Sequence, residues 1–243
     1  MDQPAPRDSR SDLVPEGHAP SARGEETRQR LLSVALRVFG RDGYDGVSTR
    51  RIAAAAEANV AAIAYHFGGK RGLYLAVARS VAERNAAFVR PMEARVAETL
   101  AEAAGDRAAL GRVLGRVVLG LMAGLGSARE DGRALFILRE LMMPSEAFDL
   151  LHEAFFLPLN RALAAIAGAA LELPPDHPTA IMRGHLLIGS VMPLIAAREV
   201  VERRLDRAIL TGGAWEETAT AAVASGCASL GLPAPDVCSL AED

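Results

Sequence analysis

Several side chains in the first third of the chain are suited to holding nucleic-acid phosphate. Ser48 and Thr49 stand where a short helix is expected to begin, and the amides and hydroxyls of a helix N-terminus hold phosphate. Lys70 opens a later helix and adds a full positive charge. Ten cationic and five acidic side chains between Arg23 and Arg79 give that segment a net charge of +5, which leaves −8 for the rest of a chain whose total is −3. A basic head on an acidic body is expected when one end of a protein binds nucleic acid.

Three predicted helices position these side chains. Apolar residues recur with helical spacing up to about Gly40, and Ser48 then caps a short helix over Thr49–Ala56. Asn59 caps a second short helix over Val60–Phe67 after a three-residue turn. A helix-turn-helix places its second short helix in the DNA major groove, which is about 12 Å wide. Small side chains let this helix lie close to the bases: Ala61, Ala62 and Ala64.

The string STRRIAAAAEANVAAIAYHFGGKRGLYLAV, Ser48 to Val77, resembles the DNA-binding head of the TetR family. The shared features are a T-x-x-x-I-A opening, a capped helix that ends in Tyr-His-Phe, and a Gly-Lys pair before the next helix. The resemblance implies that Thr49, Arg50 and Lys70 hold phosphate. It also implies that a set of side chains faces the groove or its walls: Asn59, Val60, Ala62, Tyr65 and His66.

The residues alone leave two of these assignments open. Tyr65 either faces the groove or packs in the core, and His66 either contacts a base or is simply exposed. Phe67 is expected in the core because it continues the apolar stripe of its helix. One residue departs from the family pattern: Glu57 occupies the turn where the family usually has glycine. A glycine there accepts positive φ at little cost, whereas glutamate loses about 1–2 kcal/mol.

The remainder of the chain also predicts helices, so the expected fold class is all-α: a three-helix head followed by a helical bundle for ligand binding and dimerisation. Pro91 is expected to begin a new helix after one that ends near Val89. Pro158 and Pro193 are expected to kink or split theirs. The predicted helices of the body are 107–124, 133–142, 145–171, 178–204 and 214–230.

Composition divides the chain into four parts. Residues 1–22 contain four prolines and few apolar residues, which predicts a disordered arm. The head is placed at 25–84, the body at 85–232 and a tail at 233–243. Two cysteines and no zinc-like spacing predict neither a disulfide framework nor a metal site. A polar N-terminus, and no apolar run of about 18 residues, predict a cytoplasmic protein without a membrane span.

The body resembles the CecR (YbiH) subgroup of the TetR family over two segments. FILRELMMPSEAFDLLHEAFFLPLNR, residues 136–161, carries most of the likeness, and residues 183–198 add a His-x-x-x-Gly pattern. The resemblance implies a repressor of transport or antimicrobial-tolerance genes that responds to a small molecule. The family's last two long helices form a two-fold interface, so the apolar faces here are expected to build a homodimer: Leu186, Leu187, Ile188, Val191, Leu194, Ile195, Trp215, Val223 and Leu230.

Polar groups on otherwise apolar helices mark a candidate effector site. Buried polar groups need partners, so these side chains either pair with each other between helices or bind a ligand: Arg139, Glu140, His152, Asn160, Arg183 and His185. Aromatic and methionine side chains nearby either line an adaptable pocket or belong to the core: Phe136, Met142, Met143, Phe148, Phe155 and Phe156.

The predicted function is that of a DNA-binding transcriptional regulator, a repressor whose binding to operator DNA is relieved by a small-molecule effector. No paired carboxylates, nucleophile–base pattern, phosphate loop or metal spacing indicates an enzyme, and no cofactor is expected. The alternative is a DNA-binding or architectural factor that needs no ligand.

Overall fold

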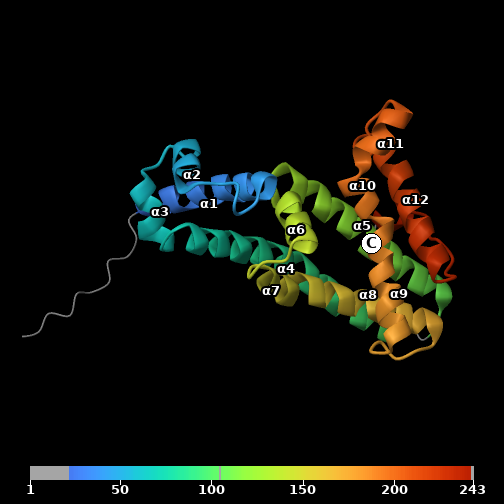
Figure 1. Cartoon of the computed structure of the whole chain (residues 1–243). Coiled ribbons are helices and arrows are strands. Elements are labelled where there is room, and N and C mark those ends of the chain that lie inside the picture. Colours follow the sequence, from blue (N-terminus) through green and yellow to red (C-terminus); the bar gives the residue numbers. More distant parts are fainter. Residues whose placement is uncertain (1–21, 104, 242–243) are drawn as a thin grey trace, which may run out of the picture.

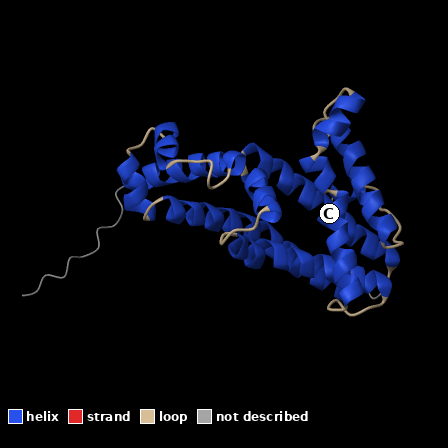
Figure 2. Cartoon of the chain, viewed as in Figure 1, coloured by secondary structure: helices blue, strands red, loops and turns tan. Residues whose placement is uncertain are grey.

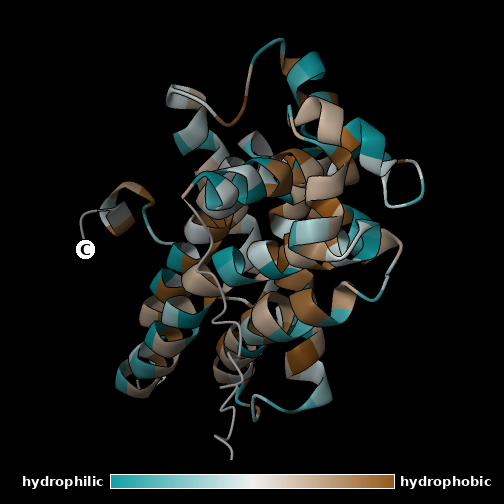
Figure 3. Ribbon diagram, turned by 90° about the vertical axis from the view of Figure 1, so that its left-hand side faces the viewer, coloured by the Kyte–Doolittle hydropathy of each residue, from teal (hydrophilic) through white to brown (hydrophobic). Residues whose placement is uncertain are grey.

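The computed structural model describes residues 22–103 and 105–241, and within them the only regular elements are helices (Figures 1 and 2). The all-α prediction is therefore confirmed. The predicted arm, apart from its last residue, lies outside the described residues. Hydrophobic residues concentrate where the helices pack against one another, and hydrophilic residues dominate the outer turns (Figure 3).

Three helices form the head: α1 (Ala22–Asp42), α2 (Thr49–Ala55) and α3 (Val60–Phe67). Their core is held by large apolar side chains that are fully buried, including Phe39, Ile52 and Ile63. The three helices lie at one end of the molecule, and α4 leads from them into the body (Figure 1). The predicted helices of the head, the first of them expected from Glu25, are thus observed to within three residues.

The helix α4 (Lys70–Ala103) is continuous, so the prediction of a new helix at Pro91 is wrong. A proline inside a helix removes one hydrogen bond and bends the axis. Apolar side chains are buried on both sides of the proline, among them Val89 and Val96. This packing holds the helix together across the lost bond. Residue 84, the predicted end of the head, lies inside α4.

Helices α5 to α8 form the centre of the body: α5 (Arg107–Glu130), α6 (Arg133–Met142), α7 (Phe148–Leu151), a π-helical segment η1 (His152–Phe156) and α8 (Leu157–Leu171). Pro158 lies in the first turn of α8, directly after the π-helical segment. The chain therefore accommodates this proline by a local change of helix type and does not break. Residues 145–147, predicted as helix, precede α7.

The C-terminal part contains α9 (Pro178–Leu187), a 3-10 segment η2 (Ile188–Ser190), α10 (Met192–Ala196), α11 (Arg198–Leu205), α12 (Gly213–Ser229) and a last 3-10 turn η3 (Cys238–Ala241). The predicted helix 178–204 is thus split near Pro193, as expected. Gly184 lets α9 lie directly against α8, because a Cβ there would be 2.6 Å from the backbone nitrogen of Ala164.

Two stretches of the body are long and apolar enough to cross a membrane by length and composition alone. The first, Phe148–Leu171, is 61% buried inside the molecule, as expected of a core helix. The second, Pro178–Ala196, is 28% buried and contains the 3-10 segment. Core helices of soluble proteins have the same composition, so this is weak support for a membrane span.

Candidate DNA-binding surface and effector cavity

Both short helices of the head begin with the predicted side-chain caps. The Ser48 Oγ accepts a hydrogen bond from the Arg51 backbone amide at 3.2 Å, and the Asn59 Oδ1 accepts one from the Ala61 amide at 2.8 Å. Each cap satisfies one of the amides that a helix N-terminus leaves without an intrahelical partner. The caps therefore fix where α2 and α3 begin.

The outer face of α3 presents the side chains that were expected to meet the groove. Tyr65 is 85% exposed and Val60 42% exposed, while Ile63 on the opposite side is buried. An aromatic ring held in solvent is available for a partner, so the structure places Tyr65 outside the core. Ala62 and His66 are half-buried. Phe67 is also half-buried and packs against the core, with the Arg28 guanidinium 5.7 Å from its ring centroid.

The expected phosphate contacts lie at the starts of α2 and α4. Arg50 is exposed and Thr49 half-buried. The Lys70 Nζ stands 4.2 Å from the ring centroid of Tyr44, which restrains the ammonium group at the head's surface. Sequence reasoning missed Tyr44, although an aromatic residue between Gly43 and Gly46 in a turn was a usable signal.

An ion pair ties α2 to the end of α1. The Arg51 guanidinium lies 2.6 Å from the Asp42 carboxylate, which also accepts a hydrogen bond from Arg41 at 3.0 Å. The hydrogen bond from Arg41 lowers the pKa of Asp42, and Arg51 adds to the effect. Arg51 therefore has a partner within the head, while its neighbour Arg50 faces solvent.

The turn between α2 and α3 carries backbone strain at Glu57, whose φ is +50°. Replacing Glu57 with glycine should raise the free energy of unfolding by about 0.5–1 kcal/mol, because relief of the strain exceeds the added entropy of the unfolded chain. Removing the carboxylate should also tighten DNA binding. Urea denaturation and a gel-shift titration measure the two effects.

Glu172→Gly is a matched control, since Glu172 has φ +57° at the end of α8, in the body. It should stabilise the protein similarly and leave DNA affinity unchanged. A loss of both stability and affinity in Glu57→Gly would contradict the assignment of this turn.

A cavity of about 410 Å³ lies in the body between α5, α6, the α7–α8 segment and the α9–α10 segment; we call it the effector cavity. Five of the side chains expected to bind ligand or line its pocket border it: Phe148, His152, Phe155, Phe156 and His185. Asn160 also borders it, and its Oδ1 lies 3.1 Å from the His185 Nδ1. The apolar wall includes side chains that sequence reasoning did not single out, although their helical spacing was visible: Leu138, Leu141 and Met192.

The other expected ligand-binding residues lie elsewhere. Phe136 is fully buried on the side of α6 that faces the head, and Arg183 is exposed on α9 outside the cavity wall. Arg139, Glu140 and Met143 border a cleft of about 730 Å³ between the head and the body. The structure therefore brings together only part of the predicted set.

Arg139 and Glu140 join α6 to the head. The Arg139 guanidinium donates to the carbonyls of Gly40 at 3.3 Å and Arg41 at 2.9 Å. The buried Glu140 carboxylate accepts hydrogen bonds from the Tyr74 hydroxyl and, at 3.1 Å, from the Ser145 amide. These contacts favour the interpretation of both side chains as an interhelical network.

The Tyr74 hydroxyl remains a hydrogen-bond donor in this network. Burial, followed by the hydrogen bond to Glu140, raises the pKa of Tyr74 well above its usual value. The ring of Tyr74 also contacts those of Phe39 and Phe136, at centroid distances of 4.9 and 5.2 Å. One tyrosine on α4 thus touches both α1 and α6.

An apolar strip on α9 is exposed in the single chain. Ile181, Met182 and Leu186 are 46%, 60% and 61% exposed. Of the residues expected at a dimer interface, Leu186 belongs to this strip, and Ile188, Val191 and Ile195 line the effector cavity. The others are buried or partly buried within the chain: Leu187, Leu194, Trp215, Val223 and Leu230.

Two family models match the chain in the order of its parts. Residues 31–77 match the bacterial regulatory proteins of the tetR family. Residues 107–229 match the C-terminal domain of the HTH-type transcriptional dual regulator CecR. The first range covers most of α1 and all of α2 and α3, and the second begins with α5 and ends with α12.

Known proteins agree with both matches. The HTH-type transcriptional dual regulator CecR of Shigella flexneri is 31% identical over 183 residues, which span 75% of this chain and 82% of that protein. The Mycobacterium smegmatis AmtR structure shares the fold with a TM-score of 0.56 at 19% identity, covering 88% of this chain and 90% of that one.

A third relative shares the fold alone. SmeT, the repressor of the Stenotrophomonas maltophilia multidrug efflux pump SmeDEF, gives a TM-score of 0.52 at 14% identity over 84% of this chain and 91% of its own. The matched families consist of transcriptional regulators and not of enzymes. The chain therefore belongs to the TetR family of bacterial transcriptional regulators, in its CecR-like subgroup.

Proposed function

We propose that this protein is a cytoplasmic repressor that binds operator DNA as a homodimer and leaves it when a small molecule occupies the effector cavity. The observation that carries this proposal is the position of α6. Ala134, Ile137 and Leu138 on α6 line the cavity, whereas Phe136, Arg139 and Glu140 on the same helix contact the head or the head-proximal turn of α4.

The DNA side of the proposal rests on α3 and its surroundings. The outward α3 residues Val60 and Tyr65 would read the groove, and Ser48, Thr49, Arg50 and Lys70 would hold phosphate. One small head binds weakly, whereas a two-fold dimer reads two half-sites about 34 Å apart. The exposed strip of Ile181, Met182 and Leu186 on α9 supports pairing with a second copy.

The chemistry of the cavity limits the effector. Its wall is mainly aliphatic and aromatic, and the polar groups on it are His152, Asn160 and His185. A volume of about 410 Å³ fits a drug-sized molecule. We therefore propose a largely apolar, aromatic effector that forms one or two hydrogen bonds with these polar side chains. SmeT's described role at a multidrug efflux pump is compatible with such a ligand.

The protein would release operator DNA because α6 can take two positions and the effector binds one of them more tightly than the other. An effector that fits better when α6 is displaced favours that arrangement, and the contacts of Arg139 and Glu140 carry the displacement to α1 and α4. Coupling energies of about 1–3 kcal/mol are usual for such systems.

The experiment uses the full chain and DNA from upstream of its own gene. Gel shifts should show sequence-dependent binding that weakens steeply with salt, as expected for several phosphate contacts. Lys70→Gln should reduce the affinity for specific and unrelated DNA alike and flatten the salt dependence. Arg203→Gln on α11, far from the head, is the charge-matched control and should change neither.

A thermal-shift screen of apolar aromatic compounds then supplies candidate effectors, and each binder is tested for release of the operator. Leu138→Trp should fill the cavity, keep operator binding and abolish release. A ligand that binds in the cavity without changing operator affinity would instead support the alternative, a factor that binds DNA independently of ligand. Equal affinity of the protein for all DNA sequences would contradict the proposal that it is an operator-specific repressor.

A further inference from the structure

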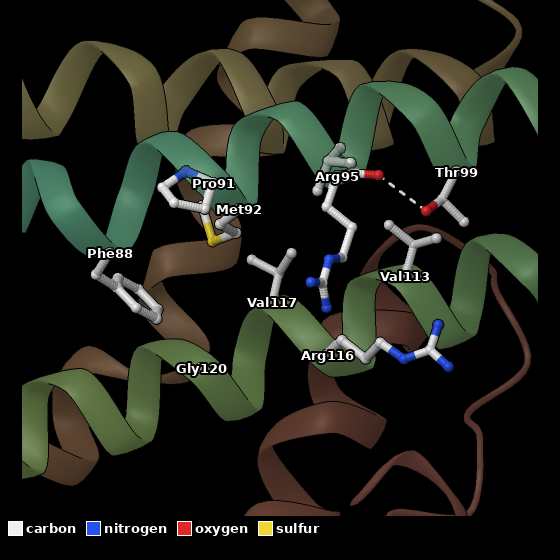
Figure 4. A pocket seen from close by; sticks show the side chains of 10 residues that line it. Phe88, Pro91, Met92, Arg95, Thr99, Val113, Arg116, Val117 and Gly120 are labelled. Carbon is white, nitrogen blue, oxygen red and sulfur yellow. Dashed lines mark hydrogen bonds between the residues drawn. The ribbon is translucent and has the colours of Figure 1, made fainter. Parts of the chain in front are cut away.

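A second and smaller hollow lies between α4 and α5; we call it the α4–α5 groove (Figure 4). Its volume is about 230 Å³, and none of the residues that line it lines the effector cavity. It is therefore a separate feature of the body. The lining residues come from one stripe of α4 and one of α5: Phe88, Pro91, Met92, Arg95, Val96, Thr99, Val113, Arg116, Val117 and Gly120.

Pro91 and Gly120 lie on the two helix stripes that line the groove. Pro91 lies inside α4, where a proline removes one intrahelical hydrogen bond. Gly120 on α5 has no side chain to fill the gap. Phe88 closes this end of the groove, since a Cβ at Gly120 would lie only 3.0 Å from its ring.

The floor and the opposite end differ in chemistry. Val96, Val113 and Val117 are buried beneath the groove and make its floor apolar. Toward the other end, Arg95 extends from α4 toward α5, and the Arg116 side chain runs along α5 (Figure 4). Arg95 is exposed, so its guanidinium can meet a ligand in the groove. An apolar floor with the Arg95 guanidinium beside it complements an amphipathic anion.

We propose that the α4–α5 groove binds a small amphipathic carboxylate, such as a medium-chain fatty acid. The hydrocarbon part would lie on the valine floor against Phe88, and the carboxylate would meet the Arg95 guanidinium, whose planar fork matches a carboxylate. Pockets for drug-sized ligands usually measure about 300–1,000 Å³. The smaller groove therefore favours a short ligand over a large lipid.

Such a ligand would act on α4 around Pro91. The groove spans residues on both sides of Pro91, from Phe88 to Thr99, so an occupant would brace α4 against α5 where the proline has removed a helix hydrogen bond. The same helix carries Lys70 and Tyr74 at its head-proximal end. The site is separate from the proposed effector cavity, so its occupancy can be measured without operator DNA.

The test is calorimetric titration of the full chain, without DNA, with sodium octanoate and with 1-octanol. Octanoate should bind, and octanol should bind far more weakly. Arg95→Gln should weaken octanoate binding at least about tenfold, because a charge-assisted hydrogen-bond pair is lost. Arg90→Gln, also exposed on α4 but outside the groove, should leave it unchanged.

Leu138→Trp separates this groove from the effector cavity, because Leu138 lines only the latter. Octanoate affinity should be retained in this variant. The proposal is overturned if octanoate does not bind, if octanol binds equally well, if Arg95→Gln has no effect, or if Leu138→Trp abolishes binding. None of these results bears on operator release, so the proposed repressor function stands or falls separately.

Discussion

Phe136→Ala should lower the free energy of unfolding by about 3–5 kcal/mol, the usual cost of emptying a fully buried phenylalanine site. Phe136 is completely buried, and its ring centroid lies 5.2 Å from that of Tyr74. The lost packing lies where α6 meets α1 and α4, so the head should also loosen from the body. Urea denaturation followed by far-ultraviolet circular dichroism measures the loss of stability.

The neighbouring residue Leu135 provides the control, because it is on the same helix but 50% exposed. Leu135→Ala should change stability by no more than about 0.5 kcal/mol, as is usual for surface positions. Comparable losses in the two variants would mean that Phe136 does not pack between head and body as described.

Glu140→Ala should cost about 2–3 kcal/mol, because it leaves the buried Tyr74 hydroxyl and the Ser145 amide without their acceptor. Within the proposed mechanism, the variant should also uncouple the effector from the DNA. It should bind effector with nearly unchanged affinity, since Glu140 does not line the effector cavity, yet release operator less completely. Denaturation and effector-dependent gel shifts measure these two effects.

Glu146→Ala is a charge-matched control six residues away. Its carboxylate pairs with Arg71 at the protein surface, and exposed ion pairs contribute about 0–1 kcal/mol. Glu140→Gln tests the chemistry further: it keeps one acceptor oxygen and should lose less stability than Glu140→Ala. If Glu140→Ala and Glu146→Ala were equally stable, the buried network would not hold the head to the body.

The head could be predicted from the sequence nearly residue by residue. Ser48 and Asn59 accept hydrogen bonds from backbone amides in the first turns of their own helices. Glu57 stands where the family usually has glycine, which marks the position as one with positive φ. Such signals are local, so neighbouring residues contain all the necessary information.

The exposure of Tyr65 could be decided only from the structure, because the rotation of α3 relative to α1 determines which face of α3 is exposed.

The body was predicted less completely because its details depend on packing between distant segments. Pro91 has the local properties of a helix boundary, but buried contacts on both sides keep α4 continuous. The π-helical segment at His152–Phe156 changes the direction of the side chains that follow, which a regular period of 3.6 residues does not anticipate. Likewise, nothing in the sequence separated the head-facing Arg139 and Glu140 from the cavity-facing His152 and His185.

The two-sided position of α6 has a consequence for how the protein would sense its ligand in the cell. Within the proposed mechanism, the factor by which effector weakens operator binding must equal the factor by which operator weakens effector binding. Protein on DNA would therefore respond only at a higher effector concentration than protein free in solution. The sensitivity of the genetic response would be set partly by the number of operator copies, and not by the cavity alone.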